Sequence, residues 1–376
     1  MDKPTVQDIF HRFYPAYLDQ YSPSPVQAKV AHNIMNCKTG AYGANVCVCE
    51  DCGFVQIHYN SCRNRCCPMC QAVPKEMWMD ARREDVLDAP YFHLVFTVPD
   101  ILNPVIYSNQ RLLYDALYHA ASSTISELTA DPKHLGAKVG YICILHTWGS
   151  EMNFHPHIHT ILLGGGLASN NQWKDNGENF FLPIRVISKM FRGKYLEELK
   201  RLWEEDKLVF HGTAEKFRNH YTFKELLDSC YGMDWIPHCK KTFNGAQTVI
   251  KYLGKYTHRI AVSNHRIVRM DDDTVTFLVK DYRNEGQWKE LTISGVEFVR
   301  RFLMHVPPRR FVRIRHYGLL CSRTKSQKLT LCEIYLDVRS IFQSFVTWKC
   351  LKYWNIFMAS KFVCVRHVVG ISESHR

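Results

Sequence analysis

Three histidines occupy alternate positions in the stretch EMNFHPHIHTILLGGG, which begins at residue 151. Side chains alternate faces along a β-strand, so His157 and His159 would share one face about 7 Å apart. Two neutral imidazoles at this spacing can converge on one divalent ion. A lone strand histidine is usually structural, but this pair favours a metal site with open positions, as chemistry at a phosphate requires. A third protein ligand is expected, and the sequence leaves Glu151, His155 and Gln247 as candidates.

Eight of the 15 cysteines fall between Cys37 and Cys70. Such a cluster predicts metal ligands rather than disulfides, because thiols stay reduced in the cytosol. Two Cys-x2-Cys pairs, 14 residues apart, can each supply two thiolates to one tetrahedral zinc ion. A structural zinc site is therefore predicted at Cys49, Cys52, Cys67 and Cys70. Five further residues could complete a second zinc site or stay unliganded, and both alternatives remain open: Cys37, Cys47, His58, Cys62 and Cys66.

The stretch QTVIKYLGKYTHR places Tyr252 and Tyr256 four residues apart, which puts both on one face of a predicted helix. Lys251, Lys255 and Arg259 surround them. Cations beside a phenol favour the phenolate, which is the form that attacks a phosphate. Taken alone, such a helix is more often simply amphipathic. The hypothesis of tyrosine nucleophiles therefore depends on the histidine pair and the cysteine cluster.

The surrounding elements predict how these residues are positioned. The run YFHLVFTVP (91–99) predicts a strand, a helical pattern follows at about 103–130, and VGYICILHTWG and FHPHIHTILLG predict two more strands. This order indicates an α+β sheet with helices on one side. Other segments add two N-terminal helices, a connecting helix, two later helices and a strand meander: 1–36, 74–89, 184–206, 245–259 and 266–294.

Charge and composition limit the choice of partners. The chain has 376 residues, a net charge of +12 and 46% hydrophobic residues, so it can bury a core and favours nucleic acid as a partner. We find no signal peptide, no transmembrane span and no phosphate-binding loop, so the expected location is cytoplasmic, without a membrane or a nucleotide cofactor. Basic residues expected to contact DNA are Arg63, Arg65, Lys251, Lys255, Arg259, Arg309, Arg310, Arg313 and Arg315.

The motifs together resemble the HUH-type, two-tyrosine rolling-circle transposases of bacterial insertion sequences, of the insertion-sequence-ninety-one type. The matching stretches span about residues 30–325: YNSCRNRCCPMCQ, YFHLVFTVP, LHTWG followed by HPHIHTILLGGGL, YLGKYTHRIAVSNHRI and FVRRFLMHVPPRRFVRIRHYGLL. The resemblance implies metal ligands at His157 and His159 and nucleophiles at Tyr252 and Tyr256. It also implies a small antiparallel sheet with flanking helices, an HUH endonuclease-like palm, after an N-terminal zinc-binding module. Cys66 stands where the family usually has histidine.

The resemblance implies a transposase that cleaves and rejoins single-stranded DNA through a 5′-phosphotyrosine intermediate, with Mg²⁺ or Mn²⁺ for catalysis and Zn²⁺ for structure. The alternatives are a catalytically inactive zinc-dependent DNA-binding protein from a decayed element, and a replication initiator or relaxase. The expected domains are N-terminal helices (1–36), a zinc-binding domain (37–73), a catalytic domain (74–270), a basic strand-rich region (271–328) and an atypical tail (329–376).

Overall fold

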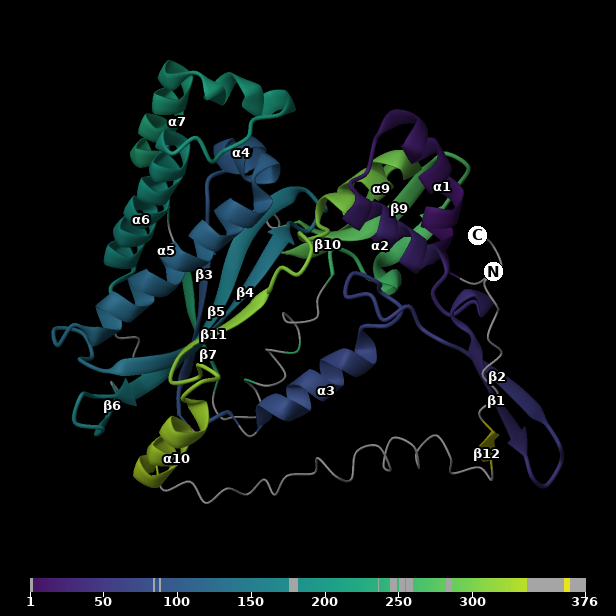
Figure 1. The fold of residues 1–376 in the computed structure, drawn as a ribbon, viewed down its shortest axis with the longest axis horizontal. Coiled ribbons are helices and arrows are strands. Elements are labelled where there is room, and N and C mark those ends of the chain that lie inside the picture. The colour runs from purple at the N-terminus through teal and green to yellow at the C-terminus, as the bar shows by residue number, and fades with distance from the viewer. Residues whose placement is uncertain are drawn as a thin grey trace, which may run out of the picture.

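The computed structural model describes residues 3–83, 85–87, 89–175, 182–235, 237–243, 249, 254, 260–281, 286–336 and 362–365. Figure 1 shows two lobes, one around a large sheet and one formed by the N-terminal helices with a smaller sheet. All pairing between the described strands is antiparallel. The α+β fold class expected from the sequence is confirmed. None of the described helices is long and apolar enough to span a lipid bilayer.

The central sheet places β4 and β5 in its middle. Over the described residues its strands run in the order β11-β4-β5-β3-β7, with β6 paired to β5. Nearly every residue of β4 and β5 is buried, as expected for apolar runs covered on both faces. The strands are β3 (Tyr91–Thr97), β4 (Lys138–Trp148), β5 (Phe154–Leu167), β6 (Trp173–Asp175), β7 (His238–Phe243) and β11 (Ile314–Gly318).

The two faces of this sheet belong to different cores. Ile158 and Leu162 of β5 pack into a core shared with α5 and α6. The alternate residue Ile161 packs into a second core, which includes Val249 and residues of α10. The helices of this lobe are α3 (Ala72–Arg83), α4 (Asn103–Ser108), α5 (Gln110–Ala130), α6 (Ile184–Glu204), α7 (His220–Gly232) and α10 (Lys325–Leu336).

The helical pattern predicted at about 103–130 is divided into α4 and α5 at Asn109. The Asn109 side chain donates to the Val209 carbonyl at 2.7 Å and accepts from the Val209 amide at 2.8 Å. These bonds fix the break, because they hold Asn109 against a segment far along the chain. Short 3₁₀ turns occupy Gly40–Tyr42, Asp100–Leu102, Gly212–Arg218 and Asn264–Arg266.

The second lobe combines the N-terminal helices with a segment from late in the chain. The N-terminal helices pack on the helix that follows the small meander, with Phe10 and Phe302 in edge contact at 5.2 Å between ring centroids. Ser24 caps α2, because its hydroxyl accepts from the Gln27 amide. The elements are α1 (Val6–Gln20), α2 (Pro25–Met35), β8 (Ile267–Met270), β9 (Thr274–Asp281), β10 (Gln287–Ser294) and α9 (Gly295–Met304).

The cysteine-rich segment forms a hairpin that projects beside the second lobe (Figure 1). It consists of β1 (Ala44–Cys49) and β2 (Val55–Tyr59), and β12 (Phe362–Val365) pairs with the other edge of β1. Its two ends meet, since the Lys38 amide donates to the Asn60 carbonyl at 3.1 Å.

Candidate functional site

A cluster of three buried histidines lies across β4 and β5. His157 and His159 point to one face of β5 as predicted, and their Nε2 atoms are 3.0 Å apart. His146 of β4 stands directly opposite His157 in the strand register. One ring nitrogen from each of the three lies within 4.8 Å of the others. The alternation of side chains and the antiparallel pairing therefore bring all three imidazoles to the same point.

The donor geometry fits a metal ion. His157 Nδ1 donates to the His155 carbonyl at 2.7 Å, which leaves the lone pair of His157 Nε2 directed at His159. A proton or a cation must then lie between the two Nε2 atoms. Two nitrogens each about 2.1 Å from an ion, at an angle near 90°, would be separated by about 3.0 Å. Imidazole nitrogens are common ligands for first-row transition metals.

His146 was not among the third ligands expected from the sequence. Glu151 is exposed in the β4–β5 turn, and its carbonyl accepts from Arg301. His155 is turned toward the surface, where its Nδ1 lies 3.2 Å from an Asp100 oxygen. Gln247 lies outside the described residues. Residue spacing did not point to His146, because it becomes a neighbour of His157 only through the register of β4 against β5.

A second layer of aromatic groups supports the cluster. His93 of β3 hydrogen-bonds to His159, with 2.9 Å between Nε2 and Nδ1. Trp148 stacks on His146 at 4.7 Å between ring centroids and 17° between planes. These contacts limit rotation of the two imidazoles, as the outer groups of metal sites commonly do.

Tyr252 and Tyr256 lie outside the described residues, as do Lys251, Lys255 and Arg259. Two neighbours in the same segment are described. Val249 is buried in the core that contains Ile142 and Ile161, on the histidine face of the sheet. Gly254 lies against α3, where an added Cβ would come within 2.0 Å of the Met79 sulfur.

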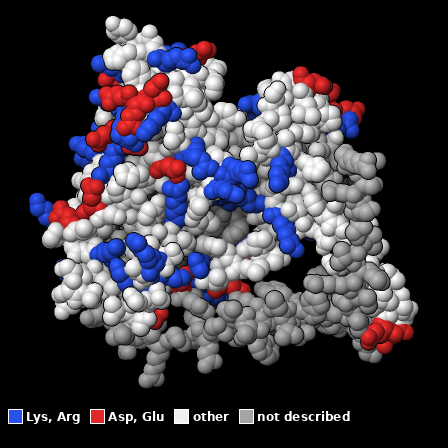
Figure 2. Space-filling view, viewed as in Figure 1, with Lys and Arg blue, Asp and Glu red and all other residues white. Residues whose placement is uncertain are grey.

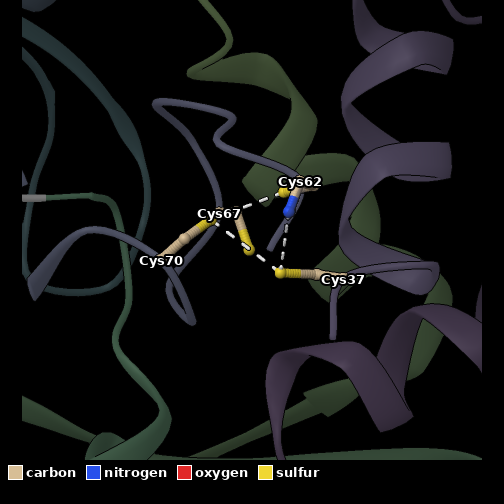
Figure 3. Close-up of side chains that lie close together, drawn as sticks. All are labelled: Cys37, Cys62, Cys67 and Cys70. Atoms are coloured by element: carbon tan, nitrogen blue, oxygen red, sulfur yellow. Dashed lines mark hydrogen bonds between the residues drawn. The ribbon is translucent and has the colours of Figure 1, made fainter. Parts of the chain in front are cut away.

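Four cysteines form a compact cluster at the base of the β1–β2 hairpin (Figure 3). Cys37, Cys62, Cys67 and Cys70 point toward one another, with ligand atoms all within 4.8 Å. The Cys70 sulfur lies 3.4 Å from that of Cys62 and 3.8 Å from that of Cys37. Thiolates about 2.3 Å from a tetrahedral zinc ion would be about 3.8 Å apart. The cluster therefore fits one structural zinc ion.

The predicted zinc site combined Cys67 and Cys70 with Cys49 and Cys52. The structure instead groups them with Cys37 and Cys62. Cys49 ends β1 and Cys52 is exposed in the turn, so both lie at the tip of the hairpin. An antiparallel hairpin instead joins the residues outside its two ends, which here are Cys37 and Cys62. Three other possible ligands lie outside the cluster: Cys47 and His58 on the hairpin strands, and Cys66, whose thiol neighbours Arg65 and Arg313.

The arginines predicted to contact DNA fall into two groups. Arg65 donates to the Phe311 carbonyl at 2.6 Å and to the Pro308 carbonyl at 3.1 Å, so it attaches the cysteine module to this loop. Arg313 lies over Trp148 at 5.8 Å from the ring centroid, and Arg315 is ion-paired with Asp115. Arg63, Arg309 and Arg310 form the second group, and their side chains are exposed, as that of Arg65 also is. Lysine and arginine side chains gather in the middle of the face drawn in Figure 2, between the lobes.

Comparisons with known proteins agree with these features. A family model described as "Putative transposase" matches residues 140–328, and one described as "Transposase zinc-binding domain" matches residues 9–98. A protein of Sinorhizobium fredii named "Putative transposase y4qJ" is 41% identical over 337 residues, which cover 89% of this chain and 85% of the relative. The transposase for insertion sequence element IS801, of Pseudomonas savastanoi pv. phaseolicola, is 30% identical over 309 residues, or 81% of this chain and 72% of the relative.

The fold and the two clusters thus occur in a transposase with a zinc-binding module. The chain belongs to the IS91 family of insertion-sequence transposases, and the resemblance expected from its sequence is confirmed. Among solved structures, the conjugative relaxase TrwC bound to oriT DNA matches with 16% identity and a TM-score of 0.25, over 29% of this chain and 44% of the relaxase chain. A copper-bound form matches with 14% identity and a TM-score of 0.27, over 54% and 69% of the two chains.

Proposed function

We propose that this transposase cleaves and rejoins single-stranded DNA through a covalent 5′-phosphotyrosine intermediate. The observation that carries the proposal is the convergence of His146, His157 and His159 within 4.8 Å. The cluster presents its nitrogens from two neighbouring strands, and over the described part of the chain the three histidines make up the whole set. Such a site leaves coordination positions for oxygen atoms of a substrate.

The three histidines would hold one divalent ion, Mg²⁺ or Mn²⁺. When bound, the ion would supply Lewis-acid polarisation of an oxygen on the scissile phosphate. Mn²⁺ matches the imidazole donors better than Mg²⁺, since Mg²⁺ prefers oxygen ligands. The hydrogen bonds of His157 to a carbonyl and of His159 to His93 orient the nitrogens that face the ion.

Tyr252 or Tyr256 would be the nucleophile. A phenolate oxygen would attack the phosphorus and form a phosphotyrosine bond, while the bond from phosphorus to the 3′ oxygen breaks. The released 3′ oxygen takes a proton and becomes a hydroxyl, and the 5′ phosphate stays on the enzyme. The second tyrosine would serve a later strand transfer. The burial of Val249 on the histidine face supports this assignment, because Val249 is three residues before Tyr252.

The cysteine module would have a structural function. Four thiolates close the coordination sphere of a zinc ion, so Cys37, Cys62, Cys67 and Cys70 would provide no open position for chemistry. Arg65 connects this module to the loop before β11. The exposed Arg63, Arg309 and Arg310 are the arginines best suited to contact DNA phosphates.

The test is adduct formation. The protein is incubated with single-stranded DNA that carries the ends of its element and with Mn²⁺, then denatured and separated by electrophoresis. A covalent protein–DNA adduct is expected, and it should be lost when Tyr252 and Tyr256 are both changed to Phe. Tyr231→Phe, which alters an exposed tyrosine of α7, is the control. An adduct that persists in the double variant would place the nucleophile elsewhere.

A further inference from the structure

Two exposed tyrosines lie where the lobes meet. Tyr107 of α4 is 44% exposed, and Tyr21, at the end of α1, is 40% exposed. Tyr21 stacks on the buried Tyr17, with 5.1 Å between ring centroids and 21° between planes. Figure 2 shows a notch between the two lobes, and α4 and α1 lie on its opposite sides in Figure 1.

A series of aromatic contacts connects this surface to the histidine cluster. Tyr107 makes an edge contact with Phe154 at 5.3 Å, and Phe154 lies parallel to His305 at 6.4 Å. His305 then meets Trp148 at 5.9 Å. Since Trp148 stacks on His146, the rings run without interruption from the surface to a candidate metal ligand.

Both lobes are attached to the same turn, between β4 and β5. On one side Asn103 of α4 donates to the Phe154 carbonyl at 3.0 Å. On the other side Arg301 of α9 donates to the Glu151 carbonyl, also at 3.0 Å, and the His305 ring bonds to the Met152 carbonyl at 3.1 Å. The β5 strand continues from this turn to His157. These bonds attach α4, which carries Tyr107, and α9, on which α1 packs, to the chain just before His157.

A positive charge lies near both tyrosines. Arg300 of α9 pairs with Glu297 at 2.6 Å, and Arg301 pairs with the same carboxylate at 2.7 Å, so the three side chains carry a net charge of +1. The pKa of Arg300 is raised, first by its bond to Glu297 and further by the phenols of Tyr21 and Tyr107. The Arg300 side chain is 35% exposed and can reach an anion.

We propose that Tyr21, Tyr107 and Arg300 bind the single strand of DNA that flanks the phosphate at the histidine centre. The tyrosines would each stack on an unpaired base, and Arg300 would contact a backbone phosphate. Alternating aromatic and cationic groups are suited to single strands, because every unpaired base offers a flat face. The bases of a duplex are stacked on each other and cannot use the same contacts. This inference rests on the proposed function for its substrate.

The test compares alanine and phenylalanine at each tyrosine. Binding of a fluorescently labelled single strand is measured by anisotropy without added Mg²⁺ or Mn²⁺, so that cleavage does not interfere. Tyr107→Ala and Tyr21→Ala should each weaken binding by about fivefold to a hundredfold, whereas Phe keeps the ring and should stay within about twofold. Tyr221→Ala, at a 77% exposed position of α7, is the matched control and should change nothing.

Two outcomes would overturn the inference. Single-strand affinity within twofold of the unaltered protein in the double alanine variant would mean that the surface does not bind this strand. In that case a protein partner would be the remaining candidate occupant. An equal loss of affinity for a duplex of the same sequence would show that the substitutions weaken DNA binding in general and do not remove a single-strand site. Adduct formation by the unaltered protein tests the proposed function separately, so either idea can fail while the other stands.

Discussion

His93 and His159 share a buried hydrogen bond, with 2.9 Å between Nε2 of His93 and Nδ1 of His159. Burial, together with the nearby His238, lowers the pKa of His93 to about 4. His93 is therefore neutral near pH 7 and can accept from His159. When it does, the lone pair of His159 Nε2 is directed at the point where the three histidines converge.

Loss of this bond should weaken metal binding. His93→Ala is expected to lower Mn²⁺ affinity about 10- to 100-fold, because His159 would lose the partner that sets its tautomer and ring orientation. His93→Gln keeps an acceptor and should restore part of the affinity. Calorimetric titration with Mn²⁺ measures this, and His316→Ala removes an imidazole outside the cluster as the control. Equal affinities for His93→Ala and the unaltered protein would contradict the assignment.

His146→Ala should abolish most of the adduct formation described above. Removing one of three ligands weakens binding of the ion, and the ion would stabilise the transition state by several kcal/mol. The rate of adduct formation should therefore fall by about a hundredfold or more. DNA affinity should largely persist, since phosphate contacts supply most of it. His155→Ala is the matched control. His155 lies on the same strand as His157, but its Nδ1 is directed at Asp100. Similar losses for the two variants would remove His146 from the ligand set.

Zinc content distinguishes the two sets of cysteines. Cys62→Ser should lose the bound zinc and unfold the module, because zinc-binding energy in such modules is largely folding energy, on the order of 10 kcal/mol. Cys49→Ser alters the hairpin tip and should keep the zinc of the cluster. Metal analysis of purified protein and its thermal unfolding provide the measurements. If Cys49→Ser loses zinc while Cys62→Ser retains it, the spacing-based pairing was right after all.

The two groups of arginines should respond differently to substitution. Changing Arg309 and Arg310 to Ala should flatten the dependence of log affinity on log salt by about 0.7 per lost phosphate contact on single strands. Arg65→Ala should instead lower the free energy of unfolding by about 1.5–3 kcal/mol, because two charged hydrogen bonds to carbonyls are lost. Salt titrations and denaturant unfolding separate these effects. A salt slope that changes with Arg65 alone would reverse the assignment.

His305 should make stability depend on pH. Burial lowers its pKa to about 4, and its ring bonds to Met152 and Thr147. Between about pH 6.5 and 4 the unfolded chain binds a proton that the folded chain does not, so stability falls as pH falls through this window. The full difference is roughly 3 kcal/mol. His305→Gln should show a shallower decline in urea unfolding, and an unchanged decline would exclude His305 as its source.

Features that depend on residues close together in the chain could be predicted from the sequence. The alternation of His157 and His159 on one strand face and the α+β class were both predicted from short-range pattern. What was missed depends on pairing between strands. His146 joins the pair because β4 and β5 share a register, and Cys62 meets Cys37 because a hairpin closes between them. A single sequence states residue spacing but not which strand positions stand opposite.

The remaining differences come from contacts over long separations. Phe10 packs on Phe302, and Arg65 bonds to a carbonyl 246 residues further along. Basic character alone predicted that Arg313 and Arg315 would face DNA, but both have internal partners in Trp148 and Asp115. An arginine can interact with an aromatic ring, a carboxylate or a phosphate, and the fold determines which of these groups lies near it.

Because β11 pairs with β4, the central sheet can be completed only late in synthesis on the ribosome. The four clustered cysteines are complete once residue 70 has emerged, so the module can take up zinc early. The strand that carries His146 cannot pair with β11 until the 166 residues after Trp148, up to Ile314, have been made. At roughly 5–20 residues per second this takes about 10 to 30 s. A nascent chain stopped before Ile314 should therefore be zinc-loaded yet show a protease-sensitive histidine sheet.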